Sequence, residues 1–299
     1  MANHRIIRRA LMVVGGLLVA STAAVIATQP PLSVGISVIR VPGYRLILNG
    51  DIVNIPVRDI ECFCWAATRA AAFLCRSKNM AIEQAEFWSR VADKYDRVAD
   101  LQIGGTTRSM LRERVARVGH LGRVVEFGCG TGFFTEVLAR RSDTLLATDI
   151  SPGMLELAKR HVKAANVTFQ AEDCQHTSLP DGTFDAAFVG LVIHFTQPGR
   201  TVAEMHRVLR PGGTLIIANV DLQALTGLSR LRSRIRVLYQ GVVGYRIKPP
   251  TGFGRNAMTE KQLGELLGRS GFRVESSETV RDSSSSANIP VECVRAVKA

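Results

Sequence analysis

The sequence predicts an α/β domain with a doubly wound, mostly parallel sheet, preceded by an N-terminal hydrophobic helix. Short apolar segments alternate with amphipathic ones through residues 80–299, as in a parallel sheet with crossover helices. The last two apolar segments, 272–279 and 291–297, flank a polar connection and predict a closing antiparallel pair. Residues 10–28 contain neither charge nor proline, which predicts the hydrophobic helix.

Composition restricts the class of protein. With 46% hydrophobic and 21% charged residues, the chain of 299 residues is globular rather than disordered. Its net charge of +12 is concentrated in residues 1–79 and in residues 222–258, which hold seven basic and no acidic residues. Any anionic partner is expected to meet these two segments. The six cysteines show no CxxC pair and no histidine at ligand spacing, so we expect neither a metal site nor a disulfide framework.

The N-terminal segment is long enough to reach across a bilayer. Residues 10–28 would form a helix of about 28 Å, close to the ~30 Å hydrocarbon core, and three arginines precede them. A membrane anchor is the favoured interpretation of residues 1–28. A cleaved signal peptide, a cleaved organelle-targeting sequence and a mis-assigned start are the alternatives.

Residues 29–79 are expected to link this segment to the main domain. The β-branched runs at 34–41 and 46–57 indicate an irregular linker or a short β-hairpin. Residues 60–75 are apolar but include Glu61 and Arg69, so an interfacial or packed helix is favoured over a second membrane crossing.

The first strand of the main domain runs into a glycine loop. Predicted helices at 83–100 and 108–118 precede a strand at 123–127, the loop at 128–132 and a helix at 133–141. A strand, a glycine loop and a helix N-terminus together form a site for a ligand that approaches the backbone closely. Asp149 follows the next strand, 145–148, where its carboxylate is placed to accept hydrogen bonds from two ribose hydroxyls.

Two helix starts can be read from capping residues. Ser151 precedes Pro152 and is the expected N-cap of the helix that follows Asp149. Thr259 and Gln262 form a capping box before an apolar stripe, and Gly271 is expected to end that helix.

The spacing of the glycines disfavours a dinucleotide fingerprint. That fingerprint would need glycine at position 133 or 135, where this chain has Phe133 and Thr135. The pattern from Glu126 to Gly132 is instead E-x-G-x-G-x-G, which resembles the first motif of the class I S-adenosylmethionine-dependent methyltransferases. The segments 149–155, 172–174, 179–185 and 209–215 resemble later motifs of the family in the same order. The likeness covers about residues 83–299 and is greatest to the ubiquinone and menaquinone methyltransferase group.

The resemblance implies a Rossmann-like methyltransferase fold with seven strands, in residues 80–299, and S-adenosyl-L-methionine as cofactor. It implies that Asp149 binds the ribose, that Ile150 lies beside the adenine and that Asp173 meets the adenine amino group. Tyr95 either closes over the cofactor or packs its own helix. The implied cofactor-binding residues are Glu126, Gly128, Cys129, Gly130, Gly132, Asp149, Ile150, Met154, Asp173, Cys174 and Tyr95.

Transfer of a sulfonium methyl needs alignment more than acid or base chemistry. His194, just after the fourth strand, is the candidate base, and the alternative is a histidine hydrogen-bonded in its loop. Asp221 and an already ionised substrate are other possibilities. The tetrapeptide of the amino-methylating nucleic-acid enzymes is absent after the fourth strand, which disfavours methylation of DNA adenine.

Residues 222–258 form a basic insertion expected to act as a lid. Within it Leu228, Leu231, Ile235 and Leu238 follow one helical stripe, with arginines on the other faces. Such a helix suits an anionic membrane surface, although an ordinary lid with solvated arginines has the same pattern. Nucleic acid is a weaker interpretation because no aromatic stacking platform accompanies the charge.

The anchor and the basic lid together predict a small, lipid-soluble acceptor at a membrane surface. The three N-terminal arginines indicate a cytoplasmic N-terminus, which for one crossing would put the domain on the far side. We expect the domain to face the cytosol. This requires that residues 60–75 return the chain across the membrane, that residues 10–28 enter the bilayer without crossing it, or that the charge rule does not hold for this protein. The other functional classes are an NAD-type oxidoreductase and a non-catalytic, cofactor-binding protein tethered to the membrane.

Overall fold

The computed structural model describes residues 45–48, 51–54, 81–100, 103–221, 231, 256–282 and 289–299. The chain divides into two compact units, Met1–Asn79 and Met80–Ala299. In the first unit, β1 (Arg45–Leu48) and β2 (Asp51–Asn54) form an antiparallel pair. The predicted helices at 10–28 and 60–75 and almost all of the basic insertion lie outside the described residues. Within the described parts of the chain, no helix is both long and apolar enough to cross a bilayer.

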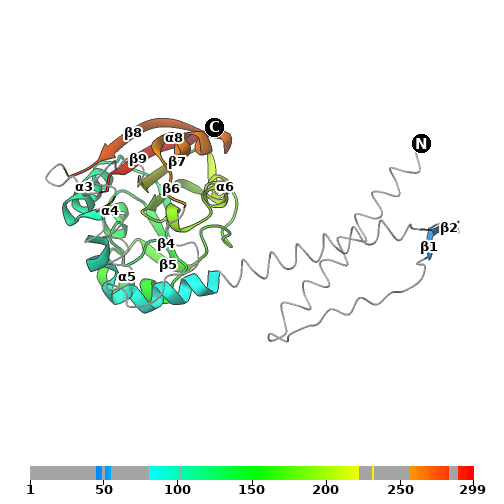
Figure 1. Cartoon of the computed structure of the whole chain (residues 1–299), viewed down its shortest axis with the longest axis horizontal. Coiled ribbons are helices and arrows are strands. Elements are labelled where there is room, and N and C mark those ends of the chain that lie inside the picture. The colour runs from blue at the N-terminus through cyan, green and yellow to red at the C-terminus, as the bar shows by residue number, and fades with distance from the viewer. Residues whose placement is uncertain are drawn as a thin grey trace. The chain divides into compact units, whose positions relative to one another are not determined.

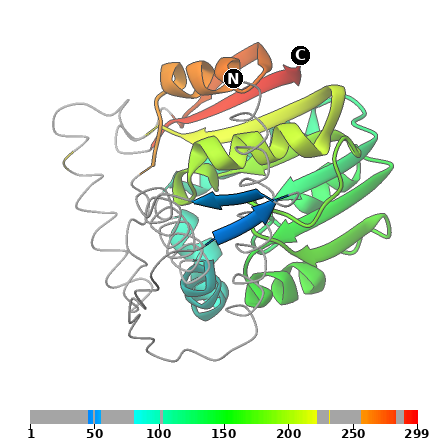
Figure 2. The same ribbon diagram turned by 90° about the vertical axis from the view of Figure 1, so that its right-hand side faces the viewer.

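The second unit is built on one seven-stranded sheet (Figures 1 and 2). The order of its strands is β5-β4-β3-β6-β7-β9-β8, and the first five are parallel. Only β9 runs against its two neighbours, β7 and β8. The predicted doubly wound sheet with a closing antiparallel pair is therefore confirmed.

The elements of this unit alternate along the chain. Residues 81–100 form its first helix. The later elements are α3 (Gly105–Ala116), β3 (Arg123–Phe127), α4 (Thr135–Ala139), β4 (Thr144–Asp149), α5 (Pro152–His161), β5 (Val167–Ala171), β6 (Phe184–Gly190), η1 (Ile193–Phe195), α6 (Pro198–Val208), β7 (Leu209–Val220), α8 (Glu260–Arg269), β8 (Phe272–Val280) and β9 (Val291–Lys298).

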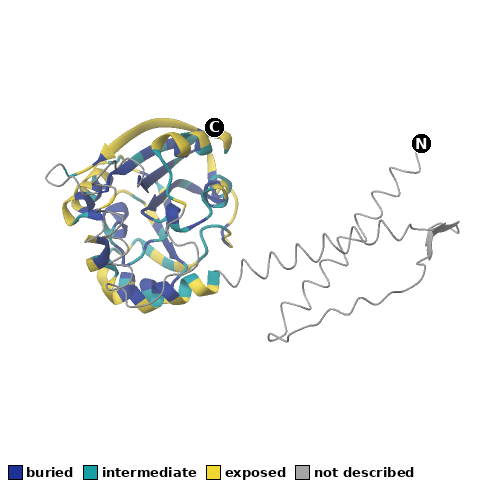
Figure 3. Ribbon diagram, in the orientation of Figure 1, coloured by how far each residue is buried: buried dark blue, intermediate teal, exposed yellow. Residues whose placement is uncertain are grey.

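Alternation of apolar side chains along the central strands creates a core on each face of the sheet. On β6, Phe188 points to the face covered by α3 and α4, and Val189 points to the face covered by α6 and α8. Figure 1 shows α3 and α4 on one side of the sheet and α6 on the other. Buried residues fill the strands between these layers, whereas the edge strand β8 is mostly exposed (Figure 3).

Several element boundaries differ from the predictions; the helix expected at 108–118, for example, is α3 at Gly105–Ala116. The helix expected at 133–141 begins only at Thr135, because Gly132 has φ +88° and delays the helical turns. The fifth parallel strand, β7, begins at Leu209, which pairs with Phe184, so it includes the whole segment 209–215 that resembles a family motif. An irregularity in the β6–β7 register accommodates the extra turn residues without ending the strand.

Both predicted helix N-caps are confirmed. The Ser151 hydroxyl accepts a hydrogen bond from the Met154 amide at 3.1 Å, at the start of α5. Thr259 and Gln262 form the reciprocal bonds of a capping box at the start of α8. These local bonds fix where each helix leaves the sheet, and α5 begins directly beside Asp149.

Candidate active site

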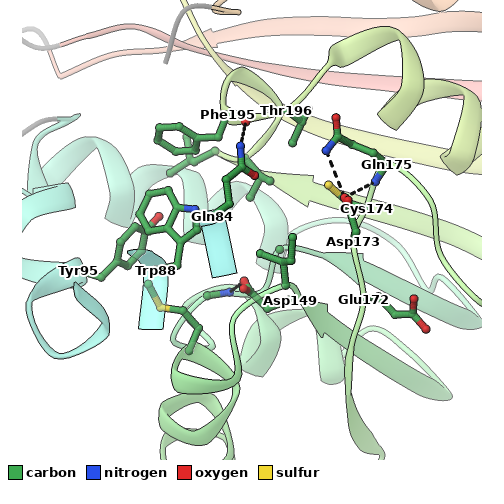
Figure 4. Close-up of a pocket in the computed structure, with 16 residues that line it drawn as sticks. Gln84, Trp88, Tyr95, Asp149, Glu172, Asp173, Cys174, Gln175, Phe195 and Thr196 are labelled. Atoms are coloured by element: carbon green, nitrogen blue, oxygen red, sulfur yellow. Dashed lines mark hydrogen bonds between the residues drawn. The ribbon is translucent and has the colours of Figure 1, made fainter. Parts of the chain in front are cut away.

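A cleft lies at the carboxyl ends of the parallel strands, as expected for a doubly wound sheet (Figure 4). With its open mouth it holds about 590 Å³ of empty space. Its lining consists of Gln84, Trp88, Tyr95, Gly128, Gly130, Asp149, Ile150, Met154, Glu172, Asp173, Cys174, Gln175, Leu191, Val192, Phe195 and Thr196. Eight of the predicted cofactor residues are among them: Tyr95, Gly128, Gly130, Asp149, Ile150, Met154, Asp173 and Cys174.

The glycine loop requires glycine at the start and at the end. Gly128 has φ +69°, and a Cβ atom there would lie 2.5 Å from Cγ2 of Val192. Gly132 has φ +88°, and a Cβ atom would lie 2.7 Å from Cγ2 of Val162. Both positions therefore combine a left-handed backbone with no space for a side chain. A Cβ atom at Gly130, in contrast, would meet nothing nearer than Tyr95 Cε1 at 3.7 Å, so this part of the loop faces the cleft.

Asp149 closes the loop from the neighbouring strand. Its Oδ2 accepts a hydrogen bond from the Gly130 amide and its Oδ1 accepts one from the Ser151 amide, each at 2.9 Å. The residue is only 8% exposed, and burial raises the pKa of its carboxyl to about 6. A carboxylate in this position suits two ribose hydroxyls, and the open space where Gly130 has no side chain allows the ligand a close approach. The cleft therefore fits a nucleoside-bearing cofactor.

Cofactor affinity should depend on pH through Asp149. Ribose hydroxyls donate to the ionised carboxylate, so binding favours the deprotonated form and weakens as pH falls below about 6. We expect the Kd of this cofactor to rise by about tenfold for each pH unit below that point. Calorimetric titration between about pH 5 and pH 7 measures this slope. The variant Asp149→Asn should bind the cofactor weakly, with a Kd that does not change with pH in this range. An equal pH dependence in the variant would contradict the assignment of the effect to Asp149.

Three predicted cofactor residues do not line the cleft. Glu126 is 1% exposed and lies beneath the loop, where its Oε2 accepts a hydrogen bond from the Thr135 hydroxyl at 2.7 Å. Burial raises the pKa of Glu126 to about 8. Cys129 is also buried, and burial raises the pKa of its thiol. Gly132 packs against Val162, the residue that follows α5. Their positions indicate a role in supporting the loop rather than in touching a ligand.

The helix at 81–100 forms one wall of the cleft. It contributes Gln84, Trp88 and Tyr95, of which only Tyr95 was predicted. The Trp88 ring makes edge-to-face contacts with Tyr95 and Phe195, at 5.7 and 5.0 Å between ring centroids. The Gln84 amide donates to the Phe195 carbonyl oxygen at 3.3 Å (Figure 4). The helix thus faces both the glycine loop and the segment after β6.

The opposite wall is the loop that follows β5. Asp173 and Cys174 lie here as predicted, next to Gln175, which was not. Oδ1 of Asp173 accepts hydrogen bonds from the backbone amide and the side chain of Gln175, at 2.9 and 3.3 Å. Behind the loop, Glu204 on α6 accepts hydrogen bonds from the amide and hydroxyl of Thr177, at 2.8 and 2.6 Å. The wall is therefore held from α6.

Glu204 should stabilise the fold in a pH-dependent way. Hydrogen bonds and Arg207 lower the pKa of its carboxyl from 4.5 to about 2 against the opposing effect of burial. Its contribution is thus present above about pH 4.5 and lost as pH falls towards 2. We expect Glu204→Gln to lower the free energy of unfolding by roughly 1–2 kcal/mol at neutral pH, since Arg207 is partly solvated. Urea denaturation at about pH 7 and pH 3 measures this difference, with exposed Glu113→Gln as the control. The difference should be smaller at the lower pH, and a difference that is as large at about pH 3 as at about pH 7 would contradict it.

The segment after β6 carries backbone strain. Leu191 is the only described non-glycine residue with a positive φ, at 61°, a conformation that costs roughly 1–2 kcal/mol. Its amide donates to the Ala218 carbonyl oxygen at 2.9 Å, which holds it in place on β7. The strain turns the chain from β6 into η1 and brings Leu191 into the lining of the cleft.

His194 is not among the residues that line the cleft, although its neighbour Phe195 is. It is 8% exposed, and its ring centroid lies 3.9 Å from that of Phe195. Its Nδ1 has no hydrogen-bond partner among the described residues, and burial lowers the pKa of the imidazole to about 4. Asp221, the other candidate base, is buried at the end of β7 and is also outside the lining. A base role for either residue stays a prediction.

Known proteins resemble this chain over the same region. Residues 125–217 match the family described as Methyltransferase domain. The malonyl-[acyl-carrier protein] O-methyltransferase of Serratia marcescens is 32% identical over 148 residues, covering 48% of this chain and 55% of the relative. The demethylmenaquinone methyltransferase of Renibacterium salmoninarum is 34% identical over 139 residues, covering 46% and 58%. The chain thus spans somewhat over half the length of these curated relatives.

A solved structure extends the likeness to a larger share of the chain. The magnesium protoporphyrin IX methyltransferase of Synechocystis PCC 6803, solved with bound SAH, covers 73% of this chain and 99% of its own, with a TM-score of 0.54. At 17% sequence identity this likeness shows the fold alone. The sheet order, the glycine loop with Asp149 and the matched family agree. The chain therefore contains a class I S-adenosylmethionine-dependent methyltransferase domain, and its cofactor is S-adenosyl-L-methionine.

Proposed function

We propose that this protein transfers a methyl group from S-adenosylmethionine to a small, lipid-soluble acceptor at a membrane surface. The observation that carries the proposal is the cleft itself, which places Asp149 and the open backbone of Gly130 opposite the aromatic side chains of Trp88, Tyr95 and Phe195. The polar side suits a nucleoside and the aromatic side suits an apolar acceptor.

The chain's own residues would bind and orient the reactants. The bound cofactor supplies a sulfonium methyl that is already electrophilic. Asp149 and the glycine loop hold the nucleoside, and the aromatic wall excludes water beside it. Burial raises the pKa of Tyr95 to about 12, so its phenol stays protonated and acts as a hydrogen-bond donor rather than a base. Alignment alone is sufficient for this class of transfer.

The sequence pattern and the name of one relative support a lipid-soluble acceptor. The apolar segment at 10–28 and the basic insertion at 222–258 suit a membrane anchor and an anionic lipid surface. One relative is named for demethylmenaquinone, a quinone. We further propose that the catalytic domain faces the cytosol, where the cofactor is made.

Calorimetry tests the cofactor part of the proposal against its alternatives. The full-length chain in detergent would be titrated separately with S-adenosylmethionine and with NADH. Binding of the methyl donor alone is expected. Binding of NADH alone would favour an oxidoreductase, and binding of the methyl donor without turnover on any lipid acceptor would favour a non-catalytic protein.

Flotation with vesicles tests the membrane part. We expect the chain to float with vesicles that contain anionic lipid, and the removal of residues 1–28 to weaken this association. Neutralising the arginines at 230, 232, 234 and 236 should weaken it further and make it less dependent on anionic lipid. A chain that stays in the soluble fraction under all lipid compositions would contradict a membrane location.

A base role for His194 has a direct test. A buried, neutral imidazole whose pKa is near 4 is a weak base, so we expect His194→Ala to lower turnover less than about tenfold while leaving cofactor affinity unchanged. Steady-state kinetics with the true acceptor measure both quantities. A much larger loss of turnover, with a pH profile that shifts in the variant, would instead assign the base role to His194.

A further inference from the structure

A buried arginine outside the cleft joins the helix at 81–100 to the rest of the site. Arg108 lies on α3, is 3% exposed and is not part of the cleft lining. Its Nη1 donates to the backbone oxygen of Asp96 at 3.0 Å and to Oδ1 of Asp100 at 2.6 Å. Its Nη2 donates to Oδ1 of Asp96 at 2.7 Å. Arg108 therefore fixes the end of the helix whose side chains form one wall of the cleft.

The same cluster reaches the glycine loop. The Thr131 hydroxyl donates to the second carboxylate oxygen of Asp96, at 2.8 Å. Thr131 lies between Gly130 and Gly132 and is 3% exposed. The Arg108 guanidinium also stacks on the ring of Phe133, with Cζ 4.1 Å from the ring centroid. Asp96 thus connects a helix and a loop that lie on two sides of the cleft.

Tyr95 carries this connection into the cleft. It directly precedes Asp96 and lines the cleft, and its ring is the nearest group to the open face of Gly130. It also contacts Trp88, the central aromatic residue of the wall. A shift of Asp96 would therefore displace Tyr95 from the glycine loop.

We propose that Arg108 is a positioning residue for the cofactor site, which acts through Asp96 to hold Tyr95 against the glycine loop. This inference rests on the proposed function, because it requires the cleft to bind S-adenosylmethionine. The role is separable from folding. Asp96 and Asp100 are 43% and 51% exposed, so water can solvate both carboxylates when the guanidinium is removed. Apolar replacements of buried ionic groups are often tolerated where the remaining partners are solvated.

Cofactor binding by the full-length chain tests the proposal. We expect Arg108→Met to raise the Kd for S-adenosylmethionine by about tenfold, and Arg108→Lys, which keeps the charge without the fork, to recover part of the loss. Arg210→Met is the matched control, since Arg210 pairs with Asp185 away from the cleft and should bind as the wild type does. Thermal unfolding of each variant reports its stability separately.

A double-mutant cycle separates positioning from a general structural effect. In a Tyr95→Ala background, Arg108→Met should change the Kd by less than about twofold, because the side chain that Arg108 positions is gone. Where Arg108→Met does not fold, Thr131→Val removes the link to the loop alone and should raise the Kd in the same way.

Several results would overturn the inference. One is an Arg108→Met variant that folds and binds S-adenosylmethionine as tightly as the wild type. If Arg108→Met does not fold, the same result in Thr131→Val would overturn the inference. Another is an equal loss of affinity with and without Tyr95, which would make Arg108 merely structural. If the wild-type chain itself binds no S-adenosylmethionine while the Arg210→Met control is folded, the proposed function fails and this inference fails with it.

Discussion

Replacing Asp149 with alanine should weaken S-adenosylmethionine binding by at least about a hundredfold. The carboxylate is placed to accept two charge-assisted hydrogen bonds from the ribose hydroxyls, and each contributes roughly 1.5–3 kcal/mol. The carboxylate also accepts hydrogen bonds from the amides of Gly130 and Ser151, so its loss leaves the glycine loop without its partner on β4. Calorimetric titration of the full-length variant measures the effect.

The matched control is Asp143→Ala. Asp143 is 71% exposed and pairs with His120 at the amino end of β4, away from the cleft. We expect this variant to bind the cofactor as tightly as the wild type. Equal affinities in Asp149→Ala and Asp143→Ala would mean that the cofactor does not bind where the cleft lies.

Replacing Gly128 with alanine should unfold the glycine loop or distort it. The new Cβ would lie 2.5 Å from Val192 Cγ2, on a backbone with φ +69°. Overpacking and the left-handed conformation together cost about 2–5 kcal/mol, and both costs apply if the loop keeps its native conformation. We therefore expect a lower melting temperature and loss of measurable cofactor binding.

Gly182→Ala separates the two causes. Gly182 has φ +59°, but a Cβ atom there would meet nothing within 4 Å. The stability of this variant should therefore fall only by the cost of a left-handed alanine, and its cofactor affinity should be unchanged. Adding Val192→Ala to Gly128→Ala should restore part of the stability, because it removes the clash. Equal effects of Gly128→Ala and Gly182→Ala would contradict the packing argument.

The sheet and the polar side of the cleft could be predicted because local sequence determines them. Strands such as Val167–Ala171 alternate apolar and polar side chains between turns, and Asp149 ends another strand, β4. Parallel strands bring their carboxyl ends to one edge, so the glycine loop and Asp149 meet there once the strands are known. This explains why eight of the eleven predicted cofactor residues line the cleft.

The remaining residues depend on tertiary contacts that leave no local pattern. Gln84 and Trp88 lie on a helix that Arg108 and Thr131 hold through Asp96, and these bonds join residues 12 and 35 positions apart in sequence. Glu126 belongs to the same motif as Gly128, yet the pleat of β3 turns its side chain beneath the loop. The strained backbone at Leu191 similarly decides which side chains of the next turn reach the cleft.

Transfer of an isotopically labelled methyl group is the most direct test of the central claim. The full-length chain would be incubated with methyl-labelled S-adenosylmethionine and with vesicles that contain anionic lipid and a demethylated quinone or a phospholipid amine. The account predicts that label enters the fraction extracted by organic solvent, and that Asp149→Ala abolishes this transfer. Label that stays in the cofactor with every lipid acceptor, while the chain remains folded, would contradict a methyltransferase acting on a lipid-soluble substrate.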